Sequence, residues 1–85
     1  MVRIPEAEVF GARLKELREH RGETVRSLAE AVETSFTYIS DLEHGRKVPS
    51  LSMLLRLAAA LDCKVTELVK VFNTHDLRSL VKKRR

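Results

Sequence analysis

Small polar, aromatic and acidic side chains are concentrated in one short stretch of the sequence, residues 35–41. The chemically useful positions are Ser35, Phe36, Thr37, Ser40 and Asp41. A hydroxyl can hydrogen-bond to a base edge or a phosphate, a phenyl ring can pack against a thymine methyl group, and a carboxylate can accept from the amino group of cytosine. These five residues therefore have the side-chain types that contacts with the bases of double-stranded DNA require.

Groups suited to phosphate binding flank the same stretch. Cationic side chains and hydroxyls bind phosphate oxygens, and so do the unpaired N–H groups in the first turn of a helix. The phosphate-contact candidates are Thr24, Val25, Arg26, Tyr38, Arg46, Lys47 and Ser50. For Arg46 and Lys47, the alternative is an ordinary solvated loop.

Two of the base-contact candidates have alternatives that the sequence leaves open. The ring of Phe36 is large enough to pack against the preceding helix instead of DNA. Asp41 is repelled by phosphates unless a base donor or a neighbouring arginine compensates its charge. Its alternatives are therefore a solvated surface charge or the exclusion of wrong DNA sequences.

Two short amphipathic patterns must hold these side chains in place. The first puts Leu28 and Val32 one helical turn apart on one face. The second puts Ile39 and Leu42 on an inward face, which leaves the candidate side chains outside. A compact helix anchored in this way is suited to a DNA groove.

Residues typical of helix ends delimit both patterns. Thr24 and Ser35 are predicted N-caps, because their hydroxyls can accept a hydrogen bond from a backbone N–H one turn later. Gly45 is suited to the left-handed conformation that ends the second helix after His44. The third position after Thr24 is Ser27 and not Glu or Gln, so no reciprocal capping box is expected.

Further amphipathic helices are expected around this central pair. One runs over residues 8–20, with Val9, Phe10, Leu14 and Leu17 on its inward side. Another begins after Pro49, and its apolar positions are Leu51, Leu54, Leu55, Ala58 and Leu61. This second helix is the most hydrophobic element, and we expect it at the centre of the core.

A short last helix is expected at about residues 76–82. Its apolar stripe, together with Phe72, comprises Leu77, Leu80 and Val81. These residues either close the monomer core or pair with a second copy, and dimerisation is favoured because palindromic DNA sites suit two-fold proteins. The basic residues 82–85 that follow either lie along a phosphate backbone or stay in solvent.

The order and spacing of these features closely resemble the helix-turn-helix of the phage-repressor-like (Cro/repressor, XRE) family of DNA-binding domains. The resemblance covers roughly residues 10–70. Besides the run from Thr24 to Gly45, it is carried by Gly11, Arg13, Leu14, Leu17, Arg18, Arg21 and Gly22, by Pro49, Ser50, Leu51, Leu54, Leu57, Ala58, Ala60 and Leu61, and by Val65, Glu67 and Leu68. Such a resemblance implies an all-α fold, a compact five-helix repressor-like DNA-binding domain with a short additional C-terminal helix.

The resemblance also implies a domain organisation. Residues 1–9 would form an N-terminal arm and the start of helix one. Residues 10–72 would form the repressor-like domain, with its helix-turn-helix at about 24–44. Residues 73–85 would form the short C-terminal helix and basic tail.

Within the family, the residues that begin the third helix face the major groove. The resemblance therefore implies that the base contacts are made by Ser35, Phe36, Thr37 and Asp41, with Ser40 near the same surface. In the same family, the arginine matching Arg18 commonly pairs with the glutamate matching Glu43. This ion pair is structural and ties helix one to the end of helix three. The chain departs from the family pattern at Val25, where a glutamine often contacts a phosphate, and at Glu23, where an apolar residue is frequent. Glu33 replaces a common turn glycine and opposes the usual turn geometry, because a non-glycine residue resists positive φ.

The charge of the chain is unevenly distributed. Its 85 residues carry a net charge of +4, which points to an anionic partner. Residues 1–45 nevertheless contain six basic and nine acidic side chains, whereas residues 46–85 contain ten and three. Any field that attracts DNA must therefore come from Arg46, Lys47 and the basic tail.

Catalysis and metal binding have little support in the sequence. The single cysteine, Cys63, is expected to be a buried small hydrophobe, and the three histidines share no ligand spacing. There is no glycine-rich phosphate loop and no nucleophile–base grouping, so we expect no enzyme, no cofactor and no metal. No signal peptide or membrane-length apolar stretch is present, which favours the cytoplasm.

The leading hypothesis is a sequence-specific transcriptional regulator that binds DNA as a homodimer through helix three. The short chain leaves no room for an effector domain, which suggests a switch set by protein concentration. The alternative is a protein-interaction module, such as a toxin-neutralising antitoxin or an adaptor, with DNA binding secondary or absent. The acidic first half and Asp41 favour this alternative.

Overall fold

Five α-helices make up the part of the chain that the computed structural model describes, residues 4–73, 77–78 and 80–81. They are α1 (Pro5–His20), α2 (Val25–Ala31), α3 (Phe36–Glu43), α4 (Leu51–Ala60) and α5 (Val65–Val69). These described residues contain no strand, so the all-α, five-helix prediction is confirmed. None of these helices has the length and apolarity that crossing a membrane requires.

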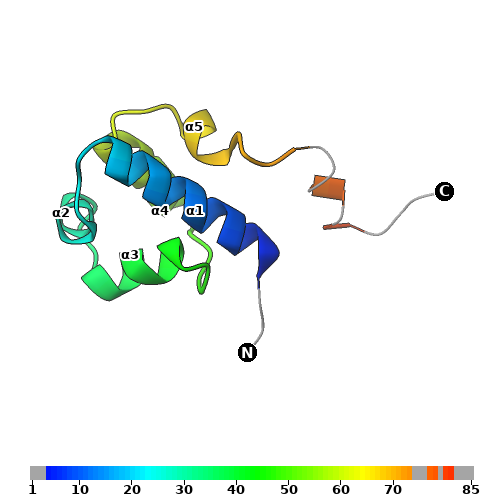
Figure 1. Ribbon diagram of the computed structural model, residues 1–85, viewed down its shortest axis with the longest axis horizontal. Coiled ribbons are helices and arrows are strands. Elements are labelled where there is room, and N and C mark those ends of the chain that lie inside the picture. The colour runs from blue at the N-terminus through cyan, green and yellow to red at the C-terminus, as the bar shows by residue number, and fades with distance from the viewer. Residues whose placement is uncertain (1–3, 74–76, 79, 82–85) are drawn as a thin grey trace.

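The first helix organises the molecule. Figure 1 shows α1 running across its middle, with α3 on one side and α5 on the other. α1 packs against both, α2 packs against α3 and α4, and α4 packs against α5. The two helices of the helix-turn-helix are therefore fixed from different directions, α2 by α4 and α3 by α1.

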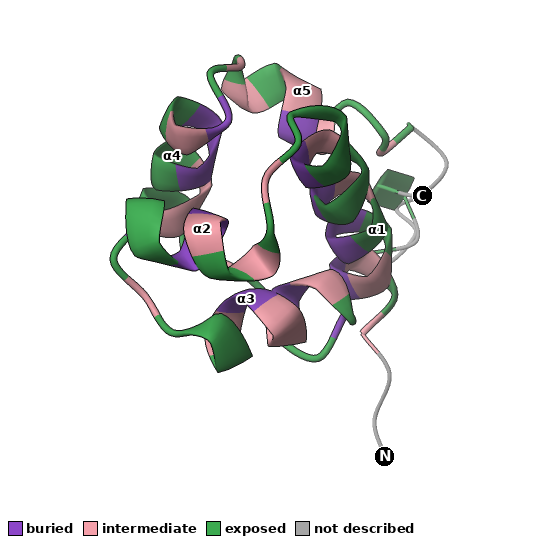
Figure 2. Cartoon of the chain, turned by 60° about the vertical axis from the view of Figure 1, so that its left-hand side comes forward, coloured by how far each residue is buried: buried purple, intermediate pink, exposed green. Residues whose placement is uncertain are grey.

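Aliphatic side chains fill the space between the helices, and Figure 2 shows the buried faces turned inward. The largest fully buried side chains are Leu14, Leu28, Ile39, Leu42, Leu57, Leu61 and Leu68. Full burial of one such side chain stabilises the fold by about 1.5–3 kcal/mol. Every helix contributes at least one of them, so no helix folds independently of the others.

Two glycines allow close backbone approach where α1 meets α3. A Cβ on Gly11 would lie 2.3 Å from the carbonyl oxygen of Leu42 and 2.6 Å from that of Glu43. Gly45 takes the predicted left-handed conformation with φ +72°, and an added Cβ would lie 2.8 Å from the Cα of Glu8. The last turn of α3 therefore rests on the backbone of α1.

The prediction for α1 was wrong at its start and partly wrong in its inward face. The helix begins at Pro5 and not at Glu8, because a proline in the first helical position lacks only an N–H that has no partner there. Val9 is 38% exposed, not buried. The inward stripe consists of Ala7, Phe10, Leu14 and Arg18. Its spacing of three or four residues leaves Val9 on a different side of the helix.

Two of the five predicted inward positions of α4 were also wrong. Leu51 and Leu55 are 70% and 52% exposed, whereas the unpredicted Leu57 is fully buried. Most of this helix is apolar, so periodicity alone did not determine which side faces inward. Leu57 and Ala58 of α4 belong to the core, to which all five helices contribute. Leu51, Leu55 and the exposed Val48 before them are called here the α4 stripe.

The predicted last helix lies partly outside the described residues. Leu77 is helical, and its N–H donates to the carbonyl oxygen of Asn73 at 3.1 Å. Phe72 packs half-buried against the core, whereas Leu77, Leu80 and Val81 are more than half exposed. Residues 76 and 79 of the predicted helix and residues 82–85 of the basic tail lie outside the described residues.

Cys63 packs against the core from the start of the α4–α5 connection, but it is half-buried and not fully buried as predicted. Burial raises the pKa of its thiol, mainly because the thiolate is poorly solvated there. The residue therefore behaves as a small apolar side chain.

Candidate nucleic-acid interface

The turn between α2 and α3 keeps a left-handed residue despite the absence of glycine. Glu33 adopts φ +57°. Two backbone hydrogen bonds hold the turn, from the N–H of Glu33 to the carbonyl of Glu30 at 3.1 Å and from that of Thr34 to Ala29 at 2.9 Å. Glu33 was expected to resist a positive φ, but the surrounding structure holds it in this conformation at the cost of local backbone strain.

Hydroxyl groups cap both helices of this unit. Ser35 caps α3 as predicted, because its Oγ accepts from the N–H of Tyr38 at 3.1 Å. The expected lack of a capping box at α2 was wrong. The N–H of Ser27 donates to Thr24 Oγ1 at 3.0 Å, and the N–H of Thr24 donates to Ser27 Oγ at 2.9 Å. A serine hydroxyl therefore closes the box here in place of the usual longer side chain.

Two aliphatic anchors fix the rotation of α3. Ile39 and Leu42 are fully buried, as predicted. The five base-contact candidates lie outside this buried face, with exposed side chains at Ser35, Phe36 and Thr37 and half-buried ones at Ser40 and Asp41. The buried side of α3 is thus formed by Ile39 and Leu42, and none of the five candidates is fully buried.

Phe36 stands at the exposed start of α3 beside an arginine of α2. Its side chain is 48% exposed. The guanidinium carbon of Arg26 lies 5.4 Å from the centre of the ring, in a cation–π arrangement. This contact restricts the position of the Phe36 ring without burying it. The ring therefore both contacts α2, through Arg26, and projects from α3 into solvent.

Asp41 lies between the two basic residues that follow α3. Arg46 Nη1 is 3.3 Å from Asp41 Oδ1, and Lys47 Nζ is 3.5 Å from Asp41 Oδ2. Lys47 Nζ also lies 5.7 Å from the centre of the Tyr38 ring. In the free protein, a neighbouring arginine therefore compensates the charge of Asp41, and a lysine does so as well.

The remaining phosphate-contact candidates lie at helix starts. Thr24 and Ser50 use their hydroxyls as caps, and Ser50 Oγ accepts from the N–H of Met53 at 3.0 Å. Val25 packs half-buried against the core, so its side chain is not available to a phosphate. Only its backbone N–H can serve that role.

The predicted ion pair between Arg18 and Glu43 is present. Arg18 Nε donates to Glu43 Oε2 at 2.6 Å, and Nη2 donates to Oε1 at 3.1 Å. Arg18 Nη1 also donates to the carbonyl of Glu23 at 2.8 Å. The hydrogen bonds that Arg18 donates to Glu43 raise the pKa of Arg18 above its usual value despite burial. Arg18 therefore stays charged while the pair joins α1 to the end of α3.

Four further polar contacts were missed by sequence analysis. Arg13 of α1 donates from Nε to the carbonyl of Glu67 at 2.8 Å and from Nη2 to its carboxylate at 3.1 Å. Lys70 lies 2.9 Å from the same carboxylate and lowers the pKa of Glu67 through this hydrogen bond. His44 Nδ1 lies 2.7 Å from the carbonyl of Ser40, and their spacing of four residues was the only signal available.

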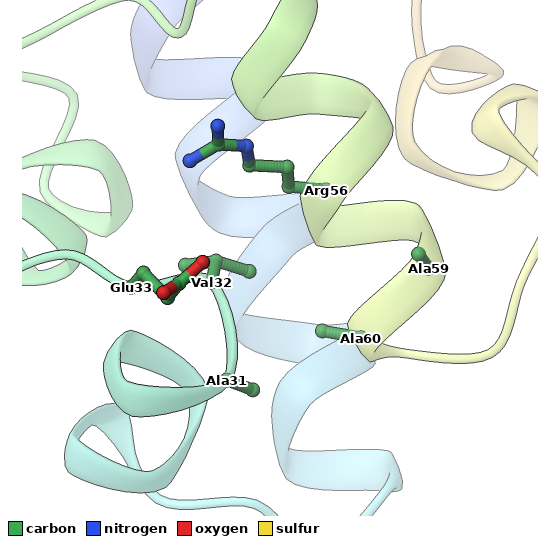
Figure 3. Close-up of a pocket in the computed structure, with 6 residues that line it drawn as sticks. All are labelled: Ala31, Val32, Glu33, Arg56, Ala59 and Ala60. Carbon is green, nitrogen blue, oxygen red and sulfur yellow. The ribbon is translucent and has the colours of Figure 1, made fainter.

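A shallow hollow lies beside the turn that joins α2 and α3. Its lining consists of Ala31, Val32, Glu33, Arg56, Ala59 and Ala60. Figure 3 shows Arg56 projecting from α4 on the side where Glu33 lies, and small apolar groups forming the rest of the wall. The described residues contain no group of histidine, cysteine and acidic side chains that could hold a metal ion.

Comparison with known proteins relates this geometry to a large group of regulators. A family model described as a helix-turn-helix domain matches residues 9–70. The HTH-type transcriptional regulator DdrOP3 of Deinococcus deserti is 43% identical over 58 residues, which cover 68% of this chain and 45% of that protein. The immunity repressor protein of Bacillus phage phi105 is 41% identical over 59 residues, covering 69% and 41%. The chain therefore matches less than half the length of these relatives.

The fold itself also matches solved structures. The restriction-modification controller protein C.AhdI of Aeromonas hydrophila superposes with a TM-score of 0.74 at 35% identity. The match covers 76% of this chain and 98% of the controller. The helix arrangement found here is thus similar to that of nearly the whole controller protein.

Proposed function

The chain belongs to the XRE-like helix-turn-helix family of DNA-binding transcriptional regulators, and we propose that it binds a palindromic operator in double-stranded DNA as a homodimer. α3 of each protomer enters the major groove. Residues 10–72 form the DNA-binding domain, with residues 24–44 as its helix-turn-helix. Residues 1–9 are the arm and helix start, and residues 73–85 are the terminal helix and tail. The protein works in the cytoplasm by binding alone.

The observation that carries this proposal is that two buried side chains fix the orientation of α3. Ile39 and Leu42 are fully buried, so the helix cannot rotate about its axis without exposing them to water. Ser35, Phe36 and Thr37 consequently point outward from its first turn. A helix of this kind fits a major groove about 12 Å wide.

Base and phosphate contacts divide between two sets of residues. Bases are contacted by Ser35, Phe36, Thr37, Ser40 and Asp41. Phosphates are held by the side chains of Arg26, Tyr38, Arg46 and Lys47 and by groups at Thr24, Val25 and Ser50. The exposure of Arg26, Arg46 and Lys47 supports this division, because phosphate contacts form at the rim of the groove.

Exposed apolar side chains support the homodimer. Leu77, Leu80 and Val81 expose more than half of their surface, and the nearby Phe72 is only partly covered. Large exposed aliphatic groups that lie close together are typical of a surface that another protein covers. We assign the dimer contact to these four residues, and the α4 stripe is the competing surface.

The test of this function is selection of a binding site from a random pool of duplexes, followed by titration at several salt concentrations. A regulator prefers its selected site over random DNA by about 10³-fold or more, and its affinity falls steeply with salt. Failure to enrich any sequence, together with equal affinity for selected and random duplexes, would reject the proposal.

A second function is favoured by one specific observation. The α4 stripe exposes Leu51 and Leu55 to solvent, on a helix that packs against α2 of the helix-turn-helix. An antitoxin or adaptor would use such a surface to hold a partner protein, with DNA binding secondary or absent. Indifference to every duplex in the selection experiment would favour this function over the first.

A further inference from the structure

The Asp41 carboxylate compensates part of the charge of the two cations best placed to hold phosphates beside α3. Each of its oxygens faces one cation, Arg46 at 3.3 Å and Lys47 at 3.5 Å. The Asp41 side chain is 17% exposed, whereas those of Arg46 and Lys47 are 54% and 55% exposed. The Asp41 carboxylate is thus largely shielded from water, whereas the exposed side chains of Arg46 and Lys47 can move away from it.

Backbone geometry keeps this group together at the end of the helix. The N–H of Arg46 donates to the carbonyl of Asp41 at 2.9 Å, which starts the following loop close to the acid. The contact between Lys47 and the Tyr38 ring also helps to hold the lysine in position. The three charged groups carry a net charge of +1, so a phosphate approaching here meets half the positive charge that two free cations would present.

DNA binding forces an exchange of partners at this point. When Arg46 and Lys47 turn toward phosphates, their hold on the carboxylate weakens in a place with little access to water. An ionised carboxylate only accepts hydrogen bonds, so a donor must replace them. Among base edges in the major groove, cytosine offers an amino group without an acceptor beside it, whereas adenine places its N7 next to its amino group. Guanine and thymine present acceptors at the corresponding positions.

We propose, on the basis of the function above, that Asp41 is a specificity-determining residue that acts by this exchange. It holds Arg46 and Lys47 in the free protein and releases them to phosphates when it accepts from the amino group of a cytosine. On other sequences the exchange leaves the carboxylate without a partner, so Asp41 weakens binding to random DNA.

Asp41→Asn tests the exchange, since it keeps the shape of the side chain and removes its charge. The probes are a random duplex, the duplex selected by the parent protein, and the selected duplex with each cytosine of a half-site replaced in turn. We expect the variant to bind random DNA more tightly, with a salt slope steeper by about one. Its affinity ratio between 50 and 200 mM salt then grows by about 3.5-fold. At one cytosine the parent loses about fivefold or more on replacement, and the variant loses much less.

Two controls separate the exchange from simpler effects of charge. Asp62→Asn removes an acid from the turn before α5, which Figure 1 shows on the far side of α1 from α3, and it should change random-duplex binding much less. In the Arg46→Gln, Lys47→Gln background, Asp41→Asn should no longer steepen the salt slope. A full effect in that background would mean direct repulsion of phosphates and would overturn the exchange.

The outcomes also separate this inference from the proposed function. If selection yields a preferred duplex but Asp41→Asn leaves random binding and cytosine dependence unchanged, the exchange is wrong and the regulator stands. Weaker binding of the variant to every duplex would also overturn it, because Asp41 would then only position the cations. Failure of the parent to select any duplex would reject the function itself.

Discussion

Arg18 and Glu43 form a two-point ion pair that joins α1 to the last turn of α3, and their side chains are only 10% and 4% exposed. Because water is nearly excluded, each charge depends on the other and on the carbonyl of Glu23. This ion pair thus links the position of α3 to the stability of the domain.

Arg18→Ala should destabilise the domain by about 3–5 kcal/mol, since it leaves the Glu43 carboxylate buried without its partner. Thermal or urea unfolding measures this loss. Arg21→Ala is the matched control, because Arg21 is 45% exposed and lies 3.9 Å from the exposed Asp62. The control should change stability by less than about 1 kcal/mol. Equal melting temperatures for Arg18→Ala and the parent protein would contradict the prediction.

Phe36→Ala should reduce affinity for the selected duplex by about 1–3 kcal/mol and leave the unfolding free energy nearly unchanged. The reason is that the ring is half exposed and anchors no part of the core. Titration of selected and random duplexes, with an unfolding curve for each variant, measures both effects. The matched control is Val48→Ala, which also shortens an exposed apolar residue and should not alter the preference. A large loss of stability in Phe36→Ala would show that the ring packs against α2 instead.

Glu33→Gly should stabilise the protein by up to about 1 kcal/mol, because relief of left-handed strain exceeds the added entropy of the unfolded chain. Gly22→Ala is the reciprocal control. Gly22 has φ +72° and open space around an added Cβ, so alanine there introduces strain without a clash and should cost about 1 kcal/mol. Destabilisation by Glu33→Gly would mean that the glutamate makes a favourable interaction that outweighs its backbone strain.

Leu77→Ser with Leu80→Ser should convert a dimer to a monomer in sedimentation or mass measurements across a range of protein concentrations. These side chains are exposed, so the folded protomer should remain intact by circular dichroism. Leu51→Ser with Leu55→Ser is the matched pair on the α4 stripe and should leave the dimer in place. The reverse result would move the dimer contact to α4, and a parent protein that is monomeric at every concentration would remove the homodimer from the proposal.

The ion-pair network of Glu67 should give stability that depends on pH. Lys70 lowers the pKa of Glu67 in the folded state, so the unfolded chain binds a proton at higher pH than the folded chain does. The contribution is present above the unfolded pKa of about 4.3 and is lost as pH falls through the folded value. The advantage of the parent over Glu67→Gln should therefore shrink below about pH 4. Glu30→Gln, at an exposed position of α2, is the matched control substitution.

Much of the fold could be predicted because its signals are local. Ile39 and Leu42 recur at helical spacing between a serine cap and a glycine, and the structure keeps all of these features. The inward side of α4 could not be predicted in the same way. Leu51 and Leu57 are equally apolar, and only packing against α2 and α5 decides which of them is buried.

The outer surface of α3 was predictable as a set of residues but not as an arrangement. Spacing identified Asp41 as outward-facing, yet its two cationic partners come from the loop beyond the helix. The contact between Arg13 and Glu67 spans 54 positions, and no local pattern encodes it. The reciprocal cap formed by Ser27 was missed because a serine side chain is shorter than the glutamate or glutamine expected there.

The bare backbone of Gly11 has a consequence for how such a domain can change over time. Because Gly11 has no side chain, the carbonyl groups of Leu42 and Glu43 can approach the backbone of α1 closely, and this approach fixes the tilt of α3 together with the Arg18–Glu43 ion pair. Residues on the outer surface of α3 can then be exchanged freely without re-aiming the helix. Under the proposed function, a new target sequence would be acquired by substitution at positions such as Thr37, while the packing beneath α3 stays the same.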